Sequence, residues 1–73
     1  MQTLVFNTKT KTVVVYENVP EESKIIYKFN DVPTVRVAEN YYEVMVKVRI
    51  EDADNRVPVA RFPISNTNML IQN

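Results

Sequence analysis

The chain has 73 residues, and its nine basic and nine acidic side chains cancel at neutral pH. It contains no His, Cys, Trp or Gly. Without His or Cys the usual acid–base and nucleophilic side chains are missing, and without Gly a phosphate-binding loop cannot form. We therefore expect a protein that is not an enzyme and that uses no metal and no cofactor. The neutral balance also disfavours duplex DNA and anionic membranes as partners.

The length allows one small β domain, residues 1–73. A chain of this size buries only about 60 to 65% of the surface that its unfolded form exposes. Since neither a disulfide nor a zinc cluster can form, self-association is the remaining common way to stabilise it. Residues 1–6 carry no basic leader and no apolar run approaches 18 residues, so we expect a cytoplasmic protein, of the producing cell or of a host, without a membrane span.

The N-terminal third predicts a β-hairpin. Residues 3–6 and 12–17 are rich in β-branched and aromatic side chains, and the polar residues 7–11 between them are typical of a hairpin loop. The run from Val13 to Tyr16 is apolar at every position. One small sheet cannot bury both faces of such a strand. We therefore predict a homo-oligomer, a dimer in the first instance, in which a second copy covers the remaining face.

Residues 18–30 fit two interpretations. Asn18 and Glu21 match a helix capping box, and Pro20 suits the first turn of a helix, so one alternative is an α+β fold with a short helix at about residues 19–29. Against this, four of the five residues from Ile25 to Phe29 are β-branched or aromatic, and such side chains favour a strand. We favour a turn at residues 21–23 followed by a strand.

The clearest periodicity runs along residues 42–50. We expect Tyr42, Val44, Val46 and Val48 to face the core, and the intervening Glu43, Met45, Lys47 and Arg49 to face solvent. Residues 34–38 alternate in the same way, and the polar pair at 39–40 separates the two runs. The pattern predicts an antiparallel hairpin.

The last third predicts a turn and two further strands. Residues 52–56 are a cluster of turn-forming side chains, and residues 57–64 resume an extended pattern that Pro58 and Pro63 restrict to a sheet edge. Residues 68–72 could add a short strand to another edge. Together these elements predict an all-β fold, a small antiparallel sheet or partly open barrel of five or six strands.

One acidic cluster could suggest a cation site. Glu51, Asp52 and Asp54 lie close together, but neither a turn glycine nor a closing glutamate completes a calcium-binding loop. We interpret the cluster as a solvated hairpin turn.

The expected exposed face mixes basic, aromatic and thioether side chains. Tyr, Met, Phe and Arg are enriched at protein interfaces. We expect a non-catalytic protein-binding module that acts through this face, in the style of accessory or inhibitor proteins of bacteriophages and mobile elements, although no motif carries that likeness. The alternative is a protein that binds single-stranded nucleic acid or a small anion. The candidate residues are Arg36, Tyr41, Met45, Lys47, Arg49, Arg61 and Phe62.

Overall fold

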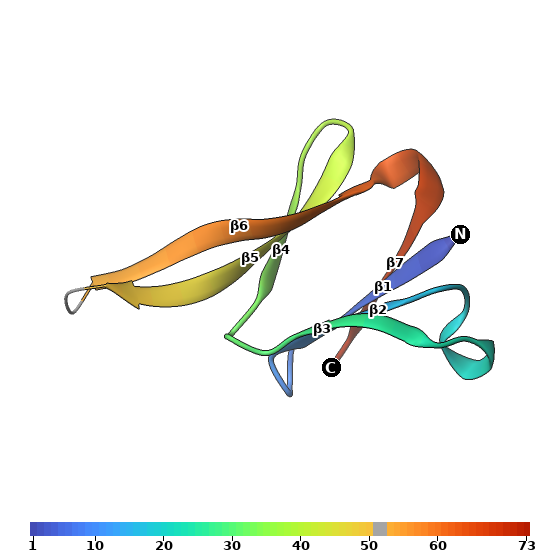
Figure 1. Cartoon of the computed structure of the whole chain (residues 1–73), viewed down its shortest axis with the longest axis horizontal. Helices are drawn as coiled ribbons and strands as arrows, with labels where there is room; N and C mark the ends of the chain where they lie inside the picture. The colour runs from blue at the N-terminus through green and yellow to red at the C-terminus, as the bar shows by residue number, and fades with distance from the viewer. Residues whose placement is uncertain (51–52) are drawn as a thin grey trace.

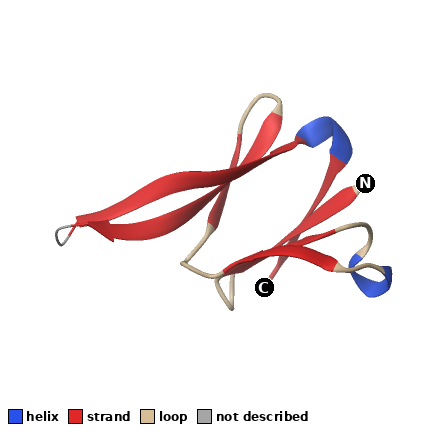
Figure 2. Cartoon of the chain, viewed as in Figure 1, coloured by secondary structure: helices blue, strands red, loops and turns tan. Residues whose placement is uncertain are grey.

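The computed structural model describes residues 1–50 and 53–73, and of residues 49, 50, 53 and 54 only the backbone. The described part contains seven strands and two single-turn 3-10 helices, which confirms the predicted all-β class (Figures 1 and 2). The elements are β1 (Gln2–Asn7), β2 (Thr12–Tyr16), η1 (Pro20–Glu22), β3 (Ile25–Phe29), β4 (Thr34–Val37), β5 (Tyr41–Ile50), β6 (Ala53–Pro63), η2 (Ile64–Asn66) and β7 (Thr67–Gln72).

The first sheet has four strands in the order β3-β2-β1-β7. The predicted hairpin of β1 and β2 is present, and the side chain of Asn7 shapes its loop by accepting hydrogen bonds from the backbone N–H groups of Lys9 and Thr10. The predicted terminal strand, β7, also lies at a sheet edge. It pairs with β1 in parallel, whereas the sequence predicted antiparallel pairing.

Residues 18–29 form a turn and a strand, as we favoured. The helical segment is limited to the single turn η1, in which Val19 precedes the first helical residue and no side chain caps the turn. Asn18 instead accepts a hydrogen bond from the amino group of Met1. The strand β3 then pairs with β2, with a bulge at Ile26. The α+β alternative is therefore wrong.

The second sheet has three strands in the order β4-β5-β6. Its two hairpins are antiparallel, as predicted. The predicted turn at residues 52–56 is wrong at its C-terminal end, because β6 begins at Ala53 and residues 53–56 pair with residues 47–50. The side chains of these residues favour a turn, but pairing of their backbone with β5 outweighs that local preference. Pro58 and Pro63 lie on an edge strand, as expected.

A bulge in β6 reverses the side-chain alternation of that strand. Val57 pairs with Val46 and Ala60 with Val44, so Val59 is an additional residue opposite β5. Before the bulge an odd-numbered residue, Val57, faces the core, and after it the even-numbered Ala60 and Phe62 do so. This change of parity decides which side chains of β6 reach solvent.

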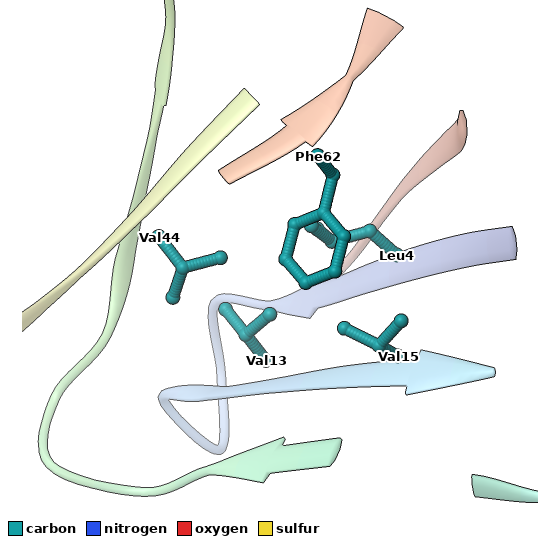
Figure 3. Close-up of a cluster of buried hydrophobic side chains, with 5 residues drawn as sticks. All are labelled: Leu4, Val13, Val15, Val44 and Phe62. Carbon is teal, nitrogen blue, oxygen red and sulfur yellow. The ribbon is translucent and has the colours of Figure 1, made fainter. Parts of the chain in front are cut away.

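The two sheets pack face to face around a small core, shown in Figure 3. Val48, predicted to belong to the core, is only half-buried, because the distal part of the β5–β6 hairpin extends past the four-stranded sheet (Figure 1). Phe62 points from β6 toward the four-stranded sheet (Figure 3). The buried cluster consists of Leu4, Val13, Val15, Val44 and Phe62.

Candidate interaction surfaces

Five of the seven candidate residues share one surface, the face of the three-stranded sheet that points away from the core. The cross-strand register places Arg36, Glu43 and Arg61 side by side on β4, β5 and β6. Strand alternation then adds Tyr41, Met45 and Lys47 of β5 to the same face. We call this surface the arginine face and define it by its described side chains: Thr34, Arg36, Tyr41, Glu43, Met45, Lys47, Arg56 and Arg61.

The other two candidates do not join them. Phe62 is 6% exposed and faces the core, so its prediction as an exposed binding residue is wrong. The bulge at Val59 is the physical reason, because it turns the even-numbered residues of β6 inward. The side chain of Arg49 lies outside the described residues.

Glu43 organises the centre of the arginine face. The sequence pattern predicted an exposed carboxylate, but Glu43 is 3% exposed, beneath two arginines whose side chains remain about two-thirds exposed. Its Oε2 accepts a hydrogen bond of 2.8 Å from Arg61 Nε, and its Oε1 lies 3.9 Å from Arg36 Nη1. A carboxylate in a sheet becomes buried in this way when long cations flank it on both neighbouring strands.

Arg61 is also supported from below by an aromatic ring. Its guanidinium carbon lies 4.8 Å from the ring centroid of Tyr41, a cation–π contact. The hydrogen bond to Glu43, followed by the electrostatic contributions of Tyr41 and Glu43, raises the pKa of Arg61 above its ordinary value. The guanidinium is thus held in a defined orientation while its outer side faces solvent.

The charge of this face departs from the neutral balance of the chain. Arg36, Lys47, Arg56 and Arg61 are cationic, and Glu43 is the single acid among the described side chains of the face. Arg56 has a structural role as well, since its Nη1 donates to the backbone oxygen of Val32 at 2.8 Å. Positive charge is therefore concentrated on one side of a chain whose total charge is zero.

A second candidate surface is a groove between β3 and β6, each of which is an edge strand of its sheet. Its volume is about 270 Å³. The rings of Tyr27 and Phe29 stack with their centroids 6.2 Å apart and form one wall. Val59, the bulged residue, stands 46% exposed on the opposite side. We call this the β3–β6 groove; it is lined by Tyr27, Phe29, Val59, Ala60, Arg61 and Phe62.

A third surface is the outer side of the four-stranded sheet. Leu4, Val13 and Val15 face the core, so the alternating positions on β1 and β2 point the other way. Register places Val14 and Leu70 on either side of Val5, and Tyr16 beside Thr3. Leu70 is 44% exposed. We call this the back face and define it by Val14, Tyr16 and Leu70, which surround Val5; Val5 itself is buried.

The sequence interpretation missed both the groove and the role of Glu43. The sequence predicts a strand at Tyr27 and Phe29, but nothing in the pattern places them opposite β6, which begins far along the chain at Ala53. The exposed apolar side chains of β3 were a usable signal, because an edge strand seldom carries consecutive residues such as Ile25, Ile26 and Tyr27 without a purpose.

The described residues also bear on metals and membranes. Among them no three His, Cys, Asp or Glu side chains gather as a metal site requires. The backbone of Asp54 belongs to β6, so Asp54 is not part of a turn. Glu51 and Asp52 and the side chain of Asp54 lie outside the described residues, so the solvation of this cluster stays a prediction. In the part of the chain with described structure, no helix has the length and apolar character needed to cross a membrane.

Comparison with known proteins gives no match among family models, curated proteins or solved structures.

Proposed function

We propose that this chain is a non-catalytic protein-binding module that holds an apolar side chain of its partner in the β3–β6 groove. The exposed apolar lining of the groove supports the proposal most directly. An open groove of about 270 Å³ whose wall carries aromatic rings can accept an apolar side chain of another protein.

The lining of the groove has the composition of an interface centre. Tyr27 is 54% exposed and Val59 46% exposed, so both offer apolar surface that a partner would remove from water. Aromatic side chains are enriched where protein interfaces are most buried. Together with Phe29 and Phe62 they could surround an inserted leucine or phenylalanine on several sides.

The strand β3 adds a backbone contribution. It is an edge strand, so one side of its backbone has no partner strand within the described chain, and an extended segment of another protein could pair with it. The bulge at Ile26 and the charge of Lys28 limit such pairing, as they do on many protected edges. We therefore expect the side-chain contacts in the groove to supply most of the affinity.

The test compares two exposed valines in the same sheet. Val59→Asp places a charge at the groove, and Val37→Asp places the same charge on β4, where Val37 is 64% exposed and does not line the groove. Proteins captured from the cell of origin with the wild-type chain should be purified and titrated against both variants. We expect Val59→Asp to weaken the affinity at least tenfold and Val37→Asp to leave it unchanged. Equal affinities, or no captured protein, would contradict the proposal.

Self-association is part of the same proposal. Val13 and Val15 fill the core while Val14 and Tyr16 of the same strand belong to the back face. Four strands at about 4.8 Å and six residues at about 3.3 Å give this face a plan area of roughly 400 Å². That area is small for a stable dimer, which usually buries about 800 Å² on each partner. We propose a weak homodimer that forms through the back face.

The proposal also includes a location and a class of protein. Neutral charge and the absence of residues for common catalytic and cofactor chemistry support a cytoplasmic accessory or inhibitor protein, of the kind that bacteriophages and mobile elements encode, which acts by occupying a surface of its target. Such a protein needs neither a cofactor nor a turnover step. Its activity would depend on the concentration and affinity of the partner alone.

A further inference from the structure

We propose that the arginine face binds single-stranded nucleic acid. This inference goes beyond the protein-binding function, because it concerns a second surface that shares only Arg61 with the groove. It rests on the charge, the spacing and the rigidity of the described side chains of the face.

Charge gives the first step. Four cations and one carboxylate occupy the face, and the carboxylate of Glu43 is 3% exposed while Arg36 and Arg61 are largely solvent-facing. An approaching ligand therefore meets guanidinium groups, with the carboxylate beneath them. Guanidinium groups bind phosphate oxygens through paired N–H donors, and Nε of Arg61 is the donor committed to Glu43.

Spacing gives the second step. Arg36 and Arg61 lie on the two strands that flank β5, so their backbones are roughly 10 Å apart. Lys47 follows Glu43 by four residues along β5, roughly 13 Å away. These three positions span a stretch of the sheet long enough for several nucleotides. Sheets that carry cations and aromatic rings are a common platform for single strands, whereas duplex DNA requires an element that enters a groove.

Rigidity gives the third step. The guanidinium of Arg61 lies over Tyr41 at 4.8 Å and is fixed by its hydrogen bond to Glu43. A planar guanidinium held in this way can receive a nucleobase on its outer side, because bases stack on arginine as they do on aromatic rings. Tyr41, Arg61 and the base would then form one stack.

Fluorescence anisotropy with labelled 12-nucleotide oligo-dT and oligo-U tests the inference on the full chain. At 50 mM salt and about 10 µM protein we expect clear binding. Each phosphate contact on a single strand contributes about 0.7 to the dependence of log affinity on log salt, so contacts from Arg36 and Arg61 predict a slope of about −1.4. No binding under these conditions would overturn the proposal.

Two substitutions identify the surface. Arg36→Ala removes a cation whose Nη1 lies 3.9 Å from Glu43 Oε1, and one lost phosphate contact should weaken binding about five- to tenfold at 50 mM salt. Lys9→Ala is the matched control, since Lys9 is exposed in the β1–β2 loop. Equal affinity of the two variants would contradict the inference.

A paired substitution separates the guanidinium from net charge. Arg61→Gln with Glu43→Gln leaves the charge of the face unchanged and avoids stranding a buried carboxylate. We expect this double variant to bind several-fold more weakly than the wild type, with an unchanged circular dichroism spectrum. Retained affinity would show that no specific contact is made and would refute the stacking arrangement. Poly-glutamate should be tested as a competitor at a carboxylate concentration equal to the phosphate concentration of the oligonucleotide. If it competes, the face is a site for an acidic protein, and the proposal is overturned.

Discussion

Replacing Phe62 by alanine tests whether this aromatic is a core residue or a surface residue. Phe62 is 6% exposed and belongs to the cluster that joins the two sheets. Removing a buried phenylalanine ring costs about 3 to 5 kcal/mol, because the transfer free energy is lost and a cavity remains. For a domain of this size 1 kcal/mol corresponds to about 4 to 8 °C in melting temperature. We therefore expect Phe62→Ala to lower the melting temperature by at least about 12 °C.

The measurement is a thermal or urea melt followed by circular dichroism. Tyr27→Ala is the matched control, since it removes an aromatic ring that is 54% exposed and should change the free energy of unfolding by no more than about 1 kcal/mol. If Phe62→Ala melts with the wild type, the ring does not pack between the sheets. The bulge at Val59 would then be misplaced, and Phe62 would return to the exposed surface that the sequence predicted.

Two further predictions concern the backbone and the back face. Val32 has a φ of 47°, which strains a β-branched residue. Val32→Gly should relieve this strain and raise the free energy of unfolding by about 1 kcal/mol, once the entropy cost of glycine is subtracted. A melting temperature below that of the wild type would contradict this. The melting temperature of the wild type should rise on a hundredfold increase in concentration, because dimer stability follows mass action. Leu70→Lys should abolish that rise, whereas Ile71→Lys, on the opposite side of β7, should retain it. Light scattering that gives 8.5 kDa for the wild type at every concentration would refute the dimer.

The strands were predictable where one local rule decided the outcome. Alternation from Tyr42 to Val46 depends on burial of one face, and the structure confirms Val44 and Val46 as buried residues. The proportion of β-branched and aromatic residues in 25–29 was sufficient to favour a strand over a helix. In both cases neighbouring residues within one element carried the signal.

The errors came from interactions between distant segments. The alternation of β6 changes parity at Val59, and no residue type marks that bulge beforehand. Glu43 is buried because Arg36 and Arg61 lie beside it on two other strands, which only the register reveals. The parallel pairing of β7 with β1 joins the two ends of the chain. Sequence periodicity describes an element but does not state which elements become neighbours.

The three surfaces differ in whether they could be occupied together. The arginine face and the back face are the outer sides of two sheets packed around a common core, so they point in opposite directions. The groove shares Arg61 with the arginine face. A partner held in the groove would therefore leave the back face free for a second copy, but it would compete with a nucleic acid for Arg61.

Site-specific photo-crosslinking tests the protein-binding groove most directly. A benzoylphenylalanine at position 27 replaces an aromatic side chain of the groove with a larger aromatic one, and the same group at position 37 occupies a site on β4 that is also exposed and does not line the groove. After irradiation in the cell of origin, we predict a discrete cross-linked product at position 27 and none at position 37. Cross-linking of the same product at both positions, or at position 37 alone, would contradict the assignment of the groove as the site of partner binding.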